Sequence, residues 1–148
     1  KDPMLYGALL QHARDNTLLQ AIRTSTANLD QTDAQAFLRQ SINRPATASA
    51  AILELGQLAN TDYATREWLL QQLGDPGHGA SAALALARLN DLTVLEDVRD
   101  LIAGDQPKLA QLRAVLVLRL SELPSAAAIR QQLLASETLD RSVRDALR

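Results

Sequence analysis

The residues best suited to metal binding or acid–base catalysis are two histidines, His12 and His78, and they lie 66 residues apart. They fall in different repeats, so they do not form the paired-histidine motif of a zinc site. The chain contains no cysteine, which excludes thiolate ligands, a cysteine nucleophile and disulfide bonds. The sequence therefore predicts no metal site, and we expect His78 to be a solvated residue at a helix entry.

Nucleophilic and carboxylate chemistry is not indicated either. No G-x-S-x-G turn is present. Glu96 and Asp100 lie one helical turn apart, but Arg99 lies in the same polar patch, so short-range ion pairs on a solvated face are expected. The glycine-dense stretch 74–79 lacks the lysine and the strand of a phosphate loop. We therefore expect no catalytic residue and no cofactor, and predict that the protein is not an enzyme.

Residues of the types that bind a partner are more evident in the sequence than catalytic residues. Trp68, the only tryptophan, follows Tyr63 and Arg66, and tryptophan is the residue most enriched in interface hot spots. Arg66, Arg99 and Arg130 recur at spacings of 33 and 31 residues. Four carboxylates lie among them: Glu67, Glu96, Asp97 and Asp100. This mixed-charge surface suits a protein or peptide better than a phosphate backbone. A core position for Trp68 and an ordinary solvated face for the arginines are the alternatives.

These side chains depend on helices that repeat every 31 residues. Segments 55–59, 86–90 and 117–121 match one another in that register. Small residues align as well: Ala48 with Gly79 and Ala110, and Ala51 with Ala82. Because small residues allow helices to approach closely, we expect these positions to lie between neighbouring helices.

Each repeat contains two amphipathic helices. The expected first helices lie near residues 45–59, 76–90 and 107–121, and the second helices near 62–73, 93–103 and 125–135. Prolines stand at expected helix starts: Pro45, Pro76, Pro107 and Pro124. Capping-box patterns occur at Thr32-x-x-Gln35 and Thr93-x-x-Glu96. Gly74 and Gly104 stand where helices should end in a left-handed residue.

Length and composition predict one all-α domain over residues 1–148. Its helical pairs are expected near 16–43, 44–74, 75–104 and 105–136, with a preceding helix at 4–14 and a partial repeat at 137–148. The incomplete ends suggest a segment of a longer array, and residues 1–3 are either a cloning remnant or the edge of a longer protein.

The net charge of −2 provides no positive field for a polyanion, so nucleic acid is disfavoured as a partner. No apolar run approaches the roughly 20 residues that span a bilayer, so no membrane insertion is expected. The compartment stays open, with the cytoplasm favoured over the periplasm.

The repeat resembles the short HEAT-like repeats of the phycobilin-lyase type. The resemblance covers residues 16–148 and is carried by four segments: Leu55-Gly56-Gln57-Leu58, Asp75-Pro76, Leu112-Arg113 and Val143-Arg144. Two segments depart from the family pattern: Gly79-Ala80 and Leu86-Ala87.

The resemblance implies a right-handed α–α superhelix of about nine or ten helices, with the second helices on its concave surface. It also implies an interaction scaffold. Two alternatives stay open: a substrate-holding subunit of a lyase or glycosylase-like enzyme, and a structural spacer in a larger protein.

Overall fold

Helices account for all the regular secondary structure in the part of the chain that the computed structural model describes, residues 2–148. The prediction of an all-α protein is therefore confirmed. The helices are α1 (Pro3–His12), α2 (Asp15–Asn28), α3 (Gln31–Ile42), α4 (Pro45–Leu58), α5 (Tyr63–Gln72), α6 (Gly79–Arg88), α7 (Leu92–Ala103), α8 (Lys108–Leu120), α9 (Pro124–Leu134) and α10 (Arg141–Leu147). Within residues 2–148, no helix is long and apolar enough to cross a membrane.

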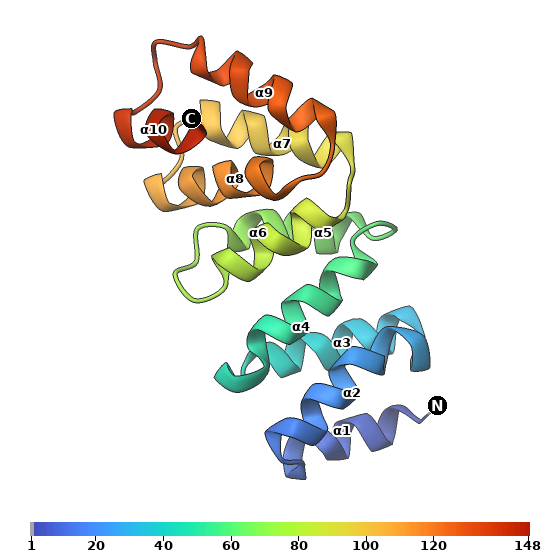
Figure 1. Ribbon diagram of the computed structural model, residues 1–148. Helices are drawn as coiled ribbons and strands as arrows, with labels where there is room; N and C mark the ends of the chain where they lie inside the picture. Colours follow the sequence, from blue (N-terminus) through green and yellow to red (C-terminus); the bar gives the residue numbers. More distant parts are fainter. Residues whose placement is uncertain (1) are drawn as a thin grey trace.

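The helices pack in chain order. Helices α2, α4, α6, α8 and α10, which we call the first helices, each contact the next one in this series. The second helices, α3, α5, α7 and α9, pack beside them: α3 against α4, α5 against α6, α7 against α8, and α9 against α8 and α10. Figure 1 follows the succession from α1 at one end of the molecule to α8, α9 and α10 at the other. Most contacts therefore join helices that are close in sequence.

One hydrophobic core runs along this succession and draws on every helix. Burying a leucine or isoleucine side chain stabilises a protein by about 1.5–3 kcal/mol. The largest fully buried side chains are Leu18, Ile22, Leu38, Ile52, Leu55, Leu69, Leu73, Leu86, Leu95, Ile102, Leu118 and Leu147. The small residues aligned by the 31-residue register are also buried: Ala48, Ala51, Gly79, Ala82 and Ala110.

Two of the four expected proline starts differ in the structure. Pro45 and Pro124 are the first residues of α4 and α9, as predicted. Pro76 instead lies in a turn three residues before α6, because the Asp75 carboxylate accepts hydrogen bonds from the amides of Gly77 and His78 and holds that turn. Pro107 precedes α8 as its N-cap rather than belonging to it.

Both predicted capping boxes are wrong, since an aspartate lies ahead of each threonine and performs the cap. Asp30 accepts from the amide of Asp33 at the start of α3, and Asp91 accepts from the amide of Thr93 at the start of α7. In both cases the aspartate carboxylate accepts a hydrogen bond from a free amide of the first turn, which is the role of an N-cap side chain.

The expected left-handed glycines are also wrong, because no glycine among residues 2–148 has a positive φ. Gly104 ends α7 in an extended conformation, with φ −82° and ψ 176°. The left-handed residue is Asn90, with φ 49°, just after α6. Asparagine tolerates this region because its short polar side chain can bond locally.

Candidate functional site

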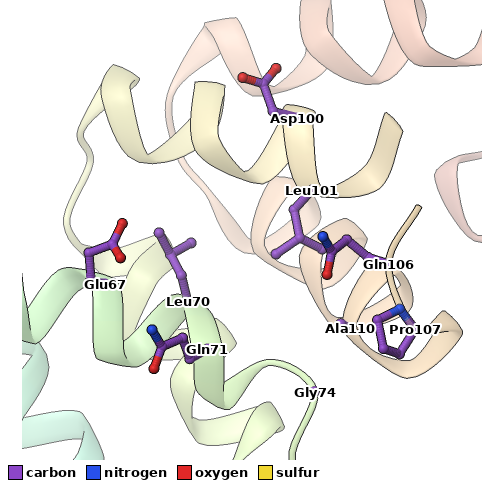
Figure 2. Close-up of a pocket in the computed structure, with 9 residues that line it drawn as sticks. All are labelled: Glu67, Leu70, Gln71, Gly74, Asp100, Leu101, Gln106, Pro107 and Ala110. Carbon is purple, nitrogen blue, oxygen red and sulfur yellow. The ribbon is translucent and has the colours of Figure 1, made fainter. Parts of the chain in front are cut away.

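A groove of about 560 Å³ opens between α5 and α7 at the start of α8 (Figure 2). This volume falls within the roughly 300–1,000 Å³ typical of ligand pockets. The groove is lined by Glu67, Leu70, Gln71, Gly74, Asp100, Leu101, Gln106, Pro107 and Ala110.

Helical periodicity explains why these side chains face the groove. Leu69 of α5 and Leu73 at its C-cap are completely buried, so Leu70 and Gln71 fall on the adjacent, outward face. In α7, Val98 and Ile102 are buried in the same way, which turns Asp100 and Leu101 outward. The apolar stripe that packs each helix therefore also determines which residues line the groove.

The groove combines apolar and polar groups. Leu70 and Leu101 are half-buried and pack against the core from opposite walls, while Gln71 contributes an amide group. Figure 2 shows Glu67 on the α5 wall and Asp100 on the α7 wall. Such a surface can hold an apolar side chain and bind polar groups around it.

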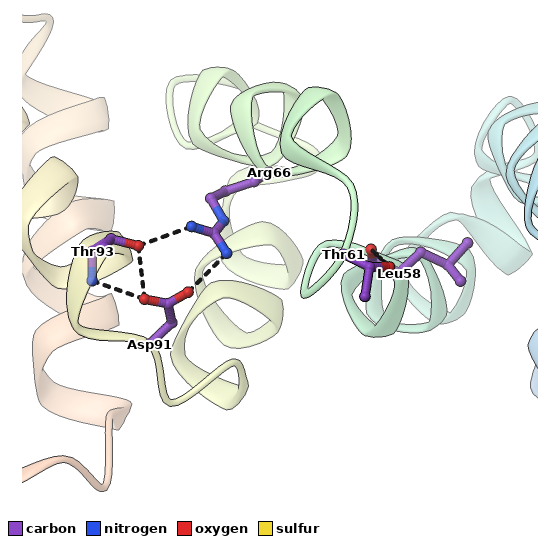
Figure 3. Close-up of polar contacts among 5 residues, drawn as sticks. All are labelled: Leu58, Thr61, Arg66, Asp91 and Thr93. Atoms are coloured by element: carbon purple, nitrogen blue, oxygen red, sulfur yellow. Dashed lines mark hydrogen bonds and ion pairs between the residues drawn. The ribbon is translucent and has the colours of Figure 1, made fainter.

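Arg66, a predicted contact residue on α5, is bonded to the start of α7 (Figure 3). Its Nη2 atom lies 2.8 Å from Oδ2 of Asp91, and its Nη1 donates to the hydroxyl of Thr93 at 2.9 Å. The Arg66 side chain is 13% exposed. Its charge therefore serves a contact between helices. Figure 3 also draws the hydroxyl of Thr61, which donates to the carbonyl of Leu58 at the end of α4.

The junction between α3 and α5 is built in the same way. The Gln35 side-chain amide donates to Asp62 at 2.7 Å and to the hydroxyl of Thr65 at 3.2 Å. Asp62 caps α5, as Asp91 caps α7. The hydroxyl of Thr65 is the main cause that lowers the pKa of Asp62, and the hydroxyl of Thr93 lowers that of Asp91. Twice in succession, one second helix thus holds the capping aspartate of the next.

The other two predicted arginines differ in their contacts. Arg99 on α7 is half-buried and pairs with the adjacent Asp100, with Nη2–Oδ1 at 2.8 Å and Nε–Oδ1 at 2.9 Å. Arg130 on α9 is half-buried, and its Nε atom has no hydrogen-bond partner among the described residues. Neither arginine lines the groove.

The two predicted aromatic contact residues lie at different depths on α5. Tyr63 is 69% exposed, and its hydroxyl donates to Oε1 of Glu67 at 3.0 Å. This hydrogen bond is the main cause that raises the pKa of Tyr63. Trp68 is half-buried against the core, with the guanidinium carbon of Arg39 located 5.4 Å from its ring centroid. That distance is typical of a cation–π contact, which joins α3 to α5.

A group of carboxylates lies beside the groove. Burial raises the pKa of Asp97, and the charges of Asp100, Glu67 and Glu96 raise it further, whereas Arg66 opposes them. The sequence identified all of these carboxylates but interpreted them as part of a mixed-charge face. Their mutual repulsion depends on how α5 and α7 pack, which the sequence alone does not specify.

None of the five predicted contact residues lines the groove, although three share helix α5 with its wall. Sequence reasoning missed the apolar wall residues Leu70 and Leu101, whose spacing matches that of ordinary core leucines. It also missed Pro107 and Ala110, which reach the groove from a different repeat. A signal that could have indicated them is their position at the junction between repeats.

Metal-ligating groups do not gather in the described chain: within residues 2–148, no three His, Asp or Glu side chains are placed to hold a metal ion. His12 is exposed on α1. Nδ1 of His78 lies 3.3 Å from the Gln72 side-chain oxygen and 3.6 Å from an Asp75 carboxylate oxygen, at the turn before α6.

In comparisons with known proteins, the chain matches no protein-family model, no curated protein and no solved structure. Its function must therefore be argued from its own residues.

Proposed function

We propose that the chain is a non-catalytic helical-repeat scaffold that binds a protein or peptide through the face of its second helices. The observation that carries this proposal is the open groove between α5 and α7, with leucines on both walls and carboxylates beside them. A groove between two second helices offers an extended segment both apolar contacts and hydrogen-bond partners.

The proposed architecture is a right-handed α–α superhelix of HEAT-like pairs, with the second helices on the concave side. The contacts of each first helix with the next support it, since a solenoid stacks units that touch only their neighbours. The recurring links from Gln35 to Asp62 and from Arg66 to Asp91 support a repeated unit as well.

The five predicted contact residues remain part of the proposal, but they contribute to binding in different ways. Tyr63 is free to contact a partner with most of its ring. Trp68 is partly exposed, with Arg39 over its ring, and Arg99 and Arg130 offer partly exposed guanidinium groups. Arg66 acts indirectly, by holding the start of α7 against α5.

The absence of cysteine allows a clean test. A random peptide library displayed on phage is selected against the unmodified chain. Binders are then measured on a Gln71→Cys variant whose thiol carries a polyethylene-glycol maleimide, which fills the groove. The matched control is an Ala27→Cys variant with the same label, because Ala27 is exposed on α2, away from the groove.

The proposal expects selected peptides to lose binding on the labelled Gln71→Cys variant and to keep it on the labelled Ala27→Cys variant. A selection that yields no binders, or binders that both labelled variants retain equally, would refute it.

The enzyme-subunit alternative would be favoured by an acidic residue in an aromatic-lined pocket. Tyr6, Phe37 and Asp33 do line one space between α1 and α3, but its volume is about 130 Å³. Ligand pockets usually hold roughly 300 Å³ or more. Tyr6 and Phe37 are themselves buried, in an edge-to-face contact with ring centroids 4.9 Å apart. We therefore prefer the scaffold.

A further inference from the structure

The cations around the groove are already paired within the molecule. Arg66 is bonded to Asp91, and Arg99 to Asp100. Lys108, next to the groove residue Pro107, lies 3.2 Å from Asp140 in an ion pair that faces α10. The mixed-charge face predicted from sequence therefore has few positive charges left to offer a partner.

The carboxylates are not balanced in the same way. Among residues 2–148, no arginine, lysine or histidine forms an ion pair with Glu67, Glu96 or Asp97. Glu67 accepts only a neutral hydrogen bond, from Tyr63. Arg99 uses a single oxygen of Asp100 for both of its bonds, so Oδ2 of Asp100 stays available. Glu67 thus carries an unpaired negative charge on the α5 wall, and on the α7 wall Asp100 is paired with Arg99 but keeps one oxygen free to accept a hydrogen bond.

The apolar part of the groove lies between these charges. Leu70 and Leu101 stand on opposite walls, and Pro107 and Ala110 close the end at the start of α8 (Figure 2). A partner would bury apolar side chains against these four residues and place its cations near Glu67 and Asp100. The groove therefore favours a partner that carries both positive charges and apolar side chains.

From this complementarity we infer that the groove binds a peptide segment in which lysine or arginine alternates with leucine-like side chains. The inference rests on the proposed function and names the chemistry of the partner. A cation at the groove forms charge-assisted hydrogen bonds with Glu67 and Asp100 and also relieves the repulsion among the carboxylates. Binding therefore depends on salt.

The test uses two fluorescein-labelled nonapeptides. One consists of the unit Gly-Lys-Leu repeated three times, and the other has glutamate in place of each lysine. Fluorescence anisotropy measures their dissociation constants with the full chain at about 25 mM and about 150 mM salt. The variant is Glu67→Gln combined with Asp100→Asn. Its matched control is Glu122→Gln combined with Glu137→Gln, which removes two exposed carboxylates outside the groove.

We expect the lysine peptide to bind, and to bind about 5- to 10-fold more weakly to the Glu67→Gln, Asp100→Asn variant. The control variant should bind as the parent does, higher salt should weaken binding, and the glutamate peptide should not bind. The polyethylene-glycol label on the Gln71→Cys variant should abolish binding.

Other outcomes separate the two proposals. If the glutamate peptide binds equally well and the label at position 71 blocks it, the charge inference is overturned and the proposed function stands. If the lysine peptide binds regardless of the label and of both carboxylates, the inference is also overturned. If no peptide, selected or designed, loses binding on the labelled Gln71→Cys variant, both proposals fail.

Discussion

At the scale of single residues, the main finding is that the most conspicuous arginine is structural. Arg66 contacts Asp91 and Thr93 at the start of the next second helix, and its side chain is largely covered. Its Nε atom is buried without a hydrogen-bond partner among the described residues. A charge held this way costs stability when its partner is removed, because the remaining charge is left partly desolvated.

Arg66→Ala should lower the free energy of unfolding by about 1–2 kcal/mol, since it removes two charge-assisted hydrogen bonds from a mostly covered site. Urea unfolding followed by circular dichroism measures this. The control is Arg99→Ala, whose pair with Asp100 is more exposed and should contribute roughly 0–1 kcal/mol. A double-mutant cycle with Asp91→Asn, which leaves a capping side chain, should give a positive coupling energy. Equal effects of the two alanine variants would contradict this interpretation.

Asp140, the N-cap of α10, should make stability depend on acid pH. Hydrogen bonds from the hydroxyl and amide of Ser142, with a further one from Lys108, lower the pKa of Asp140 from 3.8 to about 2. A lowered carboxyl pKa stabilises the folded state above the ordinary value, and this stabilisation is lost as pH falls from 3.8 to about 2.

The measurement is the unfolding free energy of the parent and of Asp140→Asn between pH 5 and pH 2, obtained with urea at about half-unit steps. The difference in unfolding free energy between the parent and Asp140→Asn should be constant down to the ordinary carboxyl pKa and should shrink below it. Ser142→Ala, which removes the hydroxyl that donates to Asp140, should reduce the pH dependence without abolishing it. If this difference in unfolding free energy is unchanged at pH 2, the charge of Asp140 is not its cause.

At the scale of helices, packing depends on small residues at defined positions. A Cβ atom added to Gly56 on α4 would lie 2.8 Å from the Cβ of Ala85 on α6. Real Cβ atoms do not approach so closely, so α4 and α6 would have to separate. Helix propensity favours alanine over glycine, but close packing opposes it at this position.

Gly56→Ala should therefore destabilise the protein, by about 1–3 kcal/mol for overpacking, offset by about 1 kcal/mol of helix propensity. Gly7→Ala on α1 is the matched control, because no atom lies within 4 Å of the added Cβ. The control should stabilise the protein or leave it unchanged. Thermal unfolding of both variants distinguishes the two effects, and a stabilising Gly56→Ala would show that the helices shift freely.

At the scale of the whole molecule, helices in the middle of the chain have more packing contacts than the helix at the N-terminal end, so local stability differs along the chain. Central helices such as α4 and α6 have neighbours on both sides. The terminal helix α1 has one buried residue, Tyr6, and exposes Met4 and Leu5. Regions with few buried contacts open locally without global unfolding.

Native-state hydrogen exchange should therefore find the amides of α1 exchanging well before those of α4 and α6. Leu86→Ala, which opens a cavity in α6, should destabilise the protein by about 2–5 kcal/mol and accelerate exchange in α4 and α8 more than in α1. Uniform acceleration in all helices would instead indicate that the chain unfolds as one cooperative unit.

The sequence by itself determined the all-α class, the approximate helix positions and the small residues buried between helices. These depend on periodicity, propensity and capping, which act within a few residues of the chain. The capping details were wrong where a nearby aspartate, such as Asp91, competed with the predicted threonine.

Only the tertiary structure decided which charges are free. Arg66 meets Asp91 across 25 residues, and Gln35 meets Asp62 across 27. The groove joins walls that come from α5, α7 and α8. Such contacts depend on how successive repeats are placed against each other, and a repeat register gives the order of helices but not the distances between their outer side chains. The sequence therefore predicted charged second helices, and the structure shows that Arg66 and Arg99 are paired within the molecule and that Glu67 and Asp100 line the groove.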